Sequence, residues 1–344
     1  MKNILILFTF IAFPLSQDLD ELYFGTDNDL DIVTWNIEWF PKNGQITIDY
    51  VGQIIESLDI DVLAIQEVDD ISSFNQVING LDNYEGYLES SWFAGLAYIY
   101  NTQTVEINNI YEIYTSSPYW SPFPRSPMVM DINFMNENYI IINNHFKCCG
   151  DDNMNLNDDD DEETRRYIAS NLLKEYVDNY FPNSNVIILG DLNDELNDDP
   201  ENNVFQMILD DSENYLFTDI EIAQGNSAGW SYPSWPSHLD HILITNELFD
   251  NNSYVEVIRI DDFLDGGFSE YDQNISDHRP VALKLTVEEI PLGDINNDGV
   301  LNVIDIVSIV NIILFNQYLD SADINIDNQV NILDVIQLVN IILN

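Results

Sequence analysis

The stretch VIILGDLND, Val186–Asp194, is an apolar run that ends in a glycine and a cluster of polar side chains. Its first four residues are continuous and mostly β-branched, which is typical of a strand covered on both faces. Asp191, Asn193 and Asp194 follow at once. Because the ends of buried strands are where a sheet presents side chains to a ligand, these residues predict a functional site and not a solvated loop.

The composition predicts a folded chain with an acid-coated surface. The 344 residues are 45% hydrophobic and 12% aromatic, enough for one large core and a small second module. Sixty-one acidic residues face ten basic ones, for a net charge of -51. This excess leaves no basic stripe, so it excludes proteins that hold nucleic acid tightly through counterion release. We expect a surface that stays soluble in salty or calcium-rich water.

The first residues have the layout of a secretory signal. Lys2 precedes an apolar run over residues 4–13, and the small residue Ser16 follows it. A core strand is the alternative, but the run shows neither alternation nor a following turn. We therefore expect a signal peptide at residues 1–16, a leader at residues 17–29 and a secreted protein. No later run is long and apolar enough to predict a transmembrane segment.

The chain has two cysteines, Cys148 and Cys149, and they are adjacent. Neighbouring Cα atoms lie about 3.8 Å apart, below the usual disulfide span of about 4.4 to 6.8 Å. The two cysteines therefore cannot form a disulfide that cross-links distant parts of the fold. A free pair, a vicinal disulfide and pairing with another chain all remain open.

An acidic run, NDDDDEE at residues 157–163, precedes the helical pattern RRYIASNLLKEYV at residues 165–177. We expect the run to be a solvated loop before a helix that begins near Thr164. A metal site is the alternative, but consecutive acids rarely converge on one point.

The last part of the chain is a tandem repeat. DINNDGVLNVIDIVSIVNIIL, from Asp294, aligns without a gap to DINIDNQVNILDVIQLVNIIL, from Asp323. Acids and amides alternate at the loop positions that wrap oxygen ligands around a hard cation, so both loops predict Ca²⁺ binding. The predicted side-chain ligands are Asp294, Asn296, Asp298, Asn302, Asp305, Asp323, Asn325, Asp327, Asn331 and Asp334, with the backbone carbonyls of Val300 and Gln329.

These duplicated loop and helix units resemble type I dockerin modules over residues 293–344. No helix precedes either loop, the last ligand position is Asp instead of Glu, and Asn328 stands at the glycine position of the second loop. Asn tolerates a left-handed backbone, so we expect a weaker second site. The resemblance implies docking to a cohesin domain on a scaffold or cell-surface protein.

Other apolar runs also end in polar side chains. Asn36 follows the run in DIVTWNIEWF, and Glu67 ends the run in DVLAIQEV. The remaining positions are His145 and Lys147 in YIIINNHFK, Asp240 in SHLDHILI, and Asp277 and His278 in SDHRPVALKL. Taken singly, each is more often a strand cap than a catalyst. Together they are the carboxylates, amides and imidazoles that metal-assisted hydrolysis needs.

This ordered set resembles the endonuclease/exonuclease/phosphatase superfamily, which includes pancreatic deoxyribonuclease and neutral sphingomyelinases. GDLND and SDHRP are its most specific motifs. The resemblance implies a four-layer α/β sandwich, in which helices flank two packed mixed sheets, whereas the residue patterns alone indicate only a mixed α/β domain. We expect the catalytic domain at residues 30–286, a linker at residues 287–292 and the small α-helical dockerin domain with two calcium loops at residues 293–344.

The resemblance also implies a role for each position. His278 would be the general base and Asp240 would orient it, while Asp191 and Asn193 would orient the nucleophile. His145 would donate a hydrogen bond or proton to the phosphate. The other implied contacts are Asn36, Glu67 and Asp277 with Mg²⁺ or Mn²⁺, and Arg125 and Lys147 with the substrate phosphate.

The sequence therefore predicts a secreted, metal-dependent phosphodiesterase, with an endonuclease as the leading hypothesis. The charge also permits a sphingomyelinase-like enzyme or a phosphatase of small phosphate esters. A non-catalytic binding protein displayed through its dockerin is a further alternative. Substrate specificity is expected in loops such as residues 225–237, which are rich in Trp, Tyr and Pro.

Overall fold

The computed structural model describes residues 19–26, 28–90, 92–287, 291–296 and 298–343. The predicted signal peptide at residues 1–16 lies outside the described residues. The chain divides into two compact units, Met1–Val287 and Glu288–Asn344. No described helix has the length and apolar character needed to cross a membrane.

Two six-stranded sheets form the large unit. The first has the order β11 (Asn252–Val257), β12 (Val281–Thr286), β1 (Asp29–Phe40), β2 (Val62–Val68), β4 (Gly95–Asn101) and β3 (Tyr84–Leu88). The second has the order β5 (Val105–Glu112), β6 (Met128–Phe134), β7 (Glu137–His145), β8 (Asn185–Asp191), β10 (Asp240–Thr245) and β9 (Tyr215–Phe217). Both sheets are mixed, because β1 runs parallel to β2 and β7 runs parallel to β8, while the other pairs are antiparallel.

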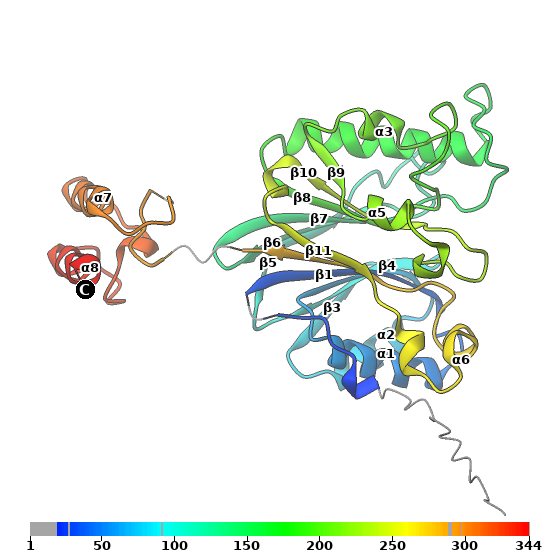
Figure 1. Cartoon of the computed structure of the whole chain (residues 1–344), viewed down its shortest axis with the longest axis horizontal. Coiled ribbons are helices and arrows are strands. Elements are labelled where there is room, and N and C mark those ends of the chain that lie inside the picture. Colours follow the sequence, from blue (N-terminus) through cyan, green and yellow to red (C-terminus); the bar gives the residue numbers. More distant parts are fainter. Residues whose placement is uncertain (1–18, 27, 91, 288–290, 297, 344) are drawn as a thin grey trace, which may run out of the picture. The chain divides into compact units, whose positions relative to one another are not determined.

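Helices cover the outer faces of the two sheets, as Figure 1 shows. The first sheet packs against α1 (Gln45–Leu58), α2 (Ile71–Gly80) and α6 (Gly267–Asn274), and the second against α3 (Glu162–Tyr180). A third apolar cluster joins the facing sides of the sheets. The shorter elements are α4 (Gln206–Leu209), α5 (Ile220–Ala223), η1 (Leu19–Glu21), η2 (Ser227–Gly229), η3 (Asn246–Leu248) and η4 (Ile260–Phe263). The predicted α/β fold with two packed mixed sheets flanked by helices is confirmed.

Strand β8 is covered on both faces, as its apolar run predicts. Ile187 and Leu189 pack between the sheets, whereas Val186 and Ile188 pack under α3. All four side chains are buried. Since alternate residues point to opposite faces of a strand, a continuous apolar run serves two cores at once.

The acidic run before α3 acts as a helix cap. Asp161 is the N-cap, and its Oδ2 accepts a hydrogen bond from the Thr164 N–H at 2.9 Å. Glu162 and Glu163 occupy the first turn, where carboxylates stabilise the positive end of the helix dipole. The helix therefore begins at Glu162, two residues before the predicted start.

The segment predicted as a leader contributes to the core of the large unit. Leu19, Leu22 and Phe24 are buried in the cluster beneath α1. The N–H groups of Phe24 and Gly25 donate to the Leu58 carbonyl at the end of α1, at 3.2 and 2.8 Å.

The small unit holds α7 (Val303–Leu314), α8 (Ile332–Leu343) and the turn η5 (Asp320–Ala322). Each predicted loop leads directly into a helix. Asp294 accepts a hydrogen bond from the Gly299 N–H at 2.7 Å, and Asp323 accepts one from the Asn328 N–H at 2.7 Å. Among the described residues of this unit, no three carboxylates come within 4.8 Å of one another. Calcium binding by these loops stays a prediction.

Candidate active site

The strand register places Asp191 between two other predicted site residues. Asp191 ends β8 and pairs with His145 on parallel strand β7 and with Asp240 on antiparallel strand β10. Gly190 allows this arrangement, since its φ is 141° and a Cβ there would lie 1.9 Å from the Asn144 carbonyl oxygen. The glycine before Asp191 is thus required by the close approach of β7.

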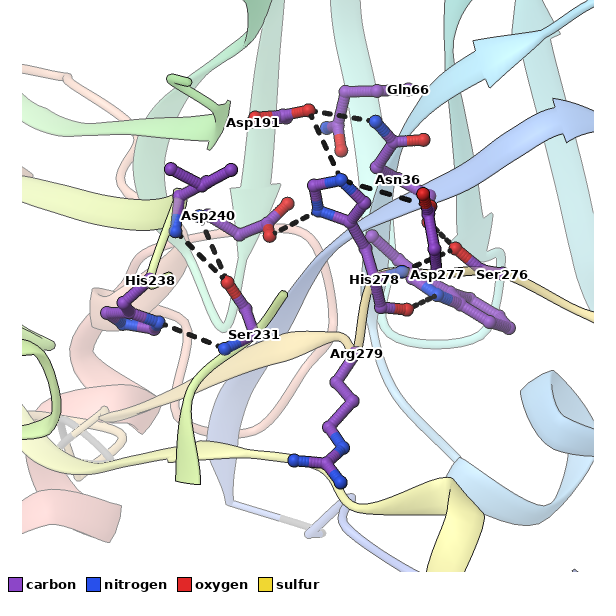
Figure 2. A network of polar contacts seen from close by, with 12 residues as sticks. Asn36, Gln66, Asp191, Ser231, His238, Asp240, Ser276, Asp277, His278 and Arg279 are labelled. Atoms are coloured by element: carbon purple, nitrogen blue, oxygen red, sulfur yellow. Dashed lines mark hydrogen bonds and ion pairs between the residues drawn. The ribbon is translucent and has the colours of Figure 1, made fainter. Parts of the chain in front are cut away.

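His278 is held between carboxylates, as Figure 2 shows. Its Nδ1–H donates to Asp240 Oδ2 at 2.7 Å, and its Nε2 lies 3.8 Å from Asp191 Oδ2. The His278 N–H donates to Ser276 Oγ at 3.0 Å, and the indole N–H of Trp35 donates to the His278 carbonyl at 3.1 Å. Both the ring and the backbone of His278 are therefore fixed.

The carboxylates of Glu67 and Asp191 both lie near the ring of His145. The His145 Nε2 atom lies 3.8 Å from Glu67 Oε1 and 3.4 Å from Asp191 Oδ2. Asn36 joins the cluster, because its Nδ2 donates to Asp191 Oδ2 at 2.8 Å. Asn36 lies within the long strand β1, just before a break in the β1–β2 register, and not at a strand tip as predicted.

A single cavity of about 620 Å³ collects most of the predicted site. Asp277 reaches it from the segment before β12, with its Oδ1 4.0 Å from His278 Nε2. The other predicted catalytic and metal-binding residues that line it are Asn36, Glu67, His145, Asp191, Asn193 and His278. Asp240 lies buried behind His278. Residues widely separated in sequence thus share one cavity.

Two predicted phosphate contacts lie on an adjoining cavity of about 900 Å³, which Glu67 and His145 also line. The Arg125 Nε–H donates to the Phe93 carbonyl at 3.0 Å. The Lys147 ammonium donates to the Cys148 carbonyl at 2.7 Å and lies 3.8 Å from Glu162. Cys148 and Cys149 are both free, with their sulfur atoms 3.0 Å apart.

Burial and neighbouring charges shift the pKa values of the site residues. Burial, with the nearby Asp240 and Glu67 carboxylates, raises the pKa of Asp191 to about 7. Burial opposes the charge on His278, but Asp240 and Asp191 outweigh it and raise the pKa of His278 to about 10. Burial and the charges of Arg125 and His278 hold the pKa of His145 well below its usual range. The lowered pKa favours the neutral form of His145.

These residues fit a divalent cation. Asn36, Glu67 and Asp277 line the cavity and offer the hard oxygen donors that Mg²⁺ and Mn²⁺ prefer, and the site's ligand atoms that lie within 4.8 Å of one another are those of Asp191, Asp240 and His278. The buried Oδ1 of Asp240 has no hydrogen-bond partner among the described residues. Burial raises the pKa of Asp191 most, and the Asp240 and Glu67 carboxylates add to the rise against the opposing effect of His278.

Two residues of the site escaped the sequence prediction. Glu38 lines the cavity and accepts the Asp277 N–H at 2.9 Å; burial and the Asp277 carboxylate raise its pKa to about 7 against the attraction of Lys42. Tyr232, from the predicted specificity loop, packs its ring 4.7 Å from the His278 ring. Glu38 lies two residues after Asn36 in DIVTWNIEWF and Tyr232 lies in the predicted loop, but nothing in the sequence distinguished these two side chains from their neighbours.

A second buried cluster joins Asp219, His238 and His241. His241 Nδ1 lies 2.6 Å from Asp219 Oδ2, and its Nε2 lies 2.9 Å from the Asp194 carbonyl oxygen. Because both partners can only accept, both ring nitrogens of His241 carry hydrogens. His238 Nε2 lies 3.0 Å from the same Asp219 oxygen, and its Nδ1 accepts the Ser231 N–H at 3.3 Å.

The sequence matches the Endonuclease/Exonuclease/phosphatase family over residues 33–278. The chain therefore belongs to this family, whose members are metal-dependent phosphoric ester hydrolases, and residues 33–278 form a catalytic domain. A comparison with curated proteins gave no match.

Solved structures share the fold. D. rerio TDP2, complexed with a single strand DNA product, has a TM-score of 0.58 and 12% identity, covering 76% of this chain and all of that one. The endonuclease/exonuclease/phosphatase from Bacteroides vulgatus has a TM-score of 0.54 and 15% identity, covering 76% and 99%. The human Nocturnin catalytic domain, with bound sulfate, has a TM-score of 0.52 and 14% identity, covering 74% and 93%. At these identities the likeness shows the fold alone.

Proposed function

We propose that this chain is a secreted endonuclease that hydrolyses phosphodiester bonds of nucleic acids with a divalent metal ion. The observation that carries the proposal is that Asp191 and His278 line one cavity with Glu67, while Asp240 holds His278 from behind. The proposal gains support from the D. rerio TDP2 fold neighbour, which holds a DNA product. The complete catalytic set argues against a protein that only binds.

Each residue of the proposed site would have its own role in the hydrolysis. The Nδ1–H of His278 is committed to Asp240, so its Nε2 faces the cavity and can take a proton from an attacking water. Asp191 and Asn193 would orient that water and the phosphoryl oxygens, and neutral His145 would donate a hydrogen bond from Nε2. Mg²⁺ or Mn²⁺, held by Asn36, Glu67 and Asp277, would polarise the phosphoryl group and stabilise negative charge.

A general base needs a pKa near the working pH, so the high pKa of His278 fits this role only when positive charge offsets the neighbouring carboxylates. Asp240 raises that pKa most, and Asp191 and Asp277 add to the rise. A divalent cation shared by the carboxylates would weaken their pull, and the pKa of His278 would fall toward the value a general base needs.

A substrate panel tests the proposal. Purified full-length chain should be assayed on DNA, RNA, sphingomyelin and sugar phosphates with Mg²⁺, with Ca²⁺ and with a chelator. We expect cleavage of nucleic acid with Mg²⁺ and none with the chelator. Turnover confined to sphingomyelin or to phosphomonoesters would instead establish the sphingomyelinase-like or phosphatase alternative.

We further propose that the small unit is a calcium-binding dockerin that docks on a cohesin domain. The observation in favour is the exposed apolar surface on both of its helices, contributed by Val303, Ile304, Val307, Ile332, Leu333 and Ile336. Such side chains mark an interaction surface when they gather. Calorimetry of the full chain should show a transition that calcium raises, and a chain truncated before Gly293 should lack it. A calcium-independent profile would contradict the dockerin assignment.

A further inference from the structure

A cavity with exposed aromatic side chains lies beside the catalytic cavity. It has a volume of about 900 Å³ and shares Trp39, Glu67 and His145 with the catalytic cavity. We call it the aromatic groove and define it by Trp39, Trp92, Phe93, Trp120, Arg125 and Arg165. Trp92 is 85% exposed and Trp120 is 64% exposed. Large exposed rings cost solvation energy, so three indoles around one concavity indicate a ligand surface.

The arginines of the groove differ from the others in the chain. Arg166, Arg259 and Arg279 each form an ion pair with a carboxylate, at 2.7, 2.9 and 2.7 Å. Arg125 and Arg165 form no such pair among the described residues, and each donates through Nε to a backbone carbonyl, at 3.0 and 2.7 Å. In a chain with 61 acidic residues, two arginines without an acidic partner lie in one groove.

The exposed indoles and the arginines without an acidic partner together indicate the class of ligand that the aromatic groove binds. A guanidinium without a carboxylate within ion-pair distance attracts a phosphate, and an indole face stacks on a nucleobase. The Arg125 guanidinium is also fixed, 4.7 Å over the Phe93 ring. Bases can stack on protein rings only when they are not stacked and paired in a duplex, so the groove suits a single strand. Charges among the rings disfavour lipid acyl chains.

We propose that the aromatic groove binds the unpaired nucleotides next to the scissile phosphate, so that the enzyme prefers single-stranded nucleic acid over duplex. Trp92 and Trp120 stack on bases, and Arg125 and Arg165 hold phosphates. The inference rests on the proposed phosphodiesterase function and adds a substrate class to it. Local contacts of this kind also suit a protein whose overall charge repels long polyanions.

The test compares kcat/KM on three substrates: a short oligothymidylate, a hairpin duplex and bis(p-nitrophenyl) phosphate. The wild type should cleave the single strand faster than the duplex. In Trp92→Ala/Trp120→Ala, the ratio of oligothymidylate to small-diester hydrolysis should fall about tenfold or more, chiefly through KM. Trp92→Phe/Trp120→Phe should recover most of that ratio, because a phenyl face still stacks. Arg165→Ala should lower it by a further few-fold.

Arg259→Ala and Tyr180→Ala are the matched controls. Both side chains are exposed and lie outside the groove and the catalytic cavity, so neither should change the ratio. An unchanged ratio in the double tryptophan variant, with the small diester still hydrolysed, would overturn the inference and leave the proposed function standing. Failure of the wild type on every diester would refute the function itself. Loss of phosphatidylcholine vesicle binding with normal oligothymidylate hydrolysis would also overturn the inference and assign the groove to a membrane.

Discussion

The large unit contains two buried clusters of aspartate and histidine that differ in their remaining bonding capacity. In the first, Asp191 and His278 line a cavity, and Asp240 keeps an oxygen without a partner among the described residues. In the second, Asp219 accepts from His241 and from the Ile242 N–H, at 2.6 and 3.0 Å, beside His238. The first cluster thus opens to a cavity through Asp191 and His278, whereas the second lines neither cavity and its Asp219 has donors on both oxygens.

The two clusters also differ in charge. His241 carries hydrogens on both nitrogens, so it forms a buried ion pair with Asp219. Burial opposes this charge separation, but His241 outweighs it and lowers the pKa of Asp219, and Asp219 raises the pKa of His241. In the first cluster, burial and neighbouring acids raise the pKa of Asp191. The second cluster thus pairs one imidazolium with one carboxylate, whereas in the first cluster Asp191 adds a second carboxylate to the pair of His278 and Asp240.

The largest expected effect is on catalysis. His278→Ala should lower kcat by about 10² to 10⁴, because it removes the general base. Its melting temperature should change far less than its rate. Circular dichroism and turnover of a small phosphodiester measure both quantities. Near-normal turnover on every phosphate ester tested would remove His278 from the mechanism.

A mutation in the second cluster should act mainly on stability. Asp219→Ala leaves the His241 imidazolium buried without its counter-ion, and we expect a loss of about 3–5 kcal/mol in unfolding free energy. Urea denaturation measures it. The milder Asp219→Asn keeps an oxygen acceptor and should lose less. A loss of activity without a loss of stability in Asp219→Ala would show that this cluster is also catalytic.

Metal binding should stabilise the first cluster by a smaller amount. Mg²⁺ at about 100 times its dissociation constant should raise the unfolding free energy by about 2.7 kcal/mol. Glu67→Gln, which keeps the shape and removes a charge, should lose most of this gain, and Asp219→Asn should retain it. Thermal melts with increasing Mg²⁺ provide the measurement. An equal rise in unfolding free energy with Mg²⁺ in Glu67→Gln and Asp219→Asn would show that Mg²⁺ binds away from Glu67.

The smallest effect is a pH window set by the second cluster. The pKa of Asp219 is lowered, so its contribution to stability is present above the unfolded value of about 3.9 and is lost as pH falls toward the folded one. The pKa of His241 is raised, so its contribution is present below about 6.5 and is lost as pH rises through the folded value.

The pair should therefore stabilise the chain most between about pH 4 and pH 6.5. Urea denaturation at several pH values, comparing the wild type with Asp219→Asn, isolates this contribution. The difference in unfolding free energy between the two should be widest inside the window. A difference in unfolding free energy that stays constant with pH would contradict a buried ion pair between Asp219 and His241.

The motifs around Asp191, Asp240 and His278 predicted that these residues come together, because each motif ends or begins a strand. Strand register then fixed the distances, since His145 and Asp240 both pair with Asp191. The mixed sheets were implied by the family resemblance, while the residue patterns alone predicted a mixed α/β domain. Local patterns thus identified the residues, and the pairing of strands supplied the geometry.

The second cluster and the aromatic groove could not be predicted in this way. His238 and His241 flank Asp240 in one stretch, but Asp219 comes from just after the end of β9, and only the packing of β9, β10 and the intervening segment brings the three together. The groove depends on segments around residues 92–93 and 120–125 and on Arg165 in the first turns of α3. Exposed tryptophans and an arginine without an acidic partner have no sequence signal, because both properties depend on what lies nearby in space.

The most direct test of the catalytic account is a double-mutant cycle on kcat/KM for a small phosphodiester with Mg²⁺, using His278→Ala, Asp240→Asn and the combined variant. Asp240 acts through His278, so the combined variant should lose about as much as His278→Ala alone. Losses that multiply, so that the combined variant is far slower than either single variant, would show that the two residues act independently and would contradict the proposed site.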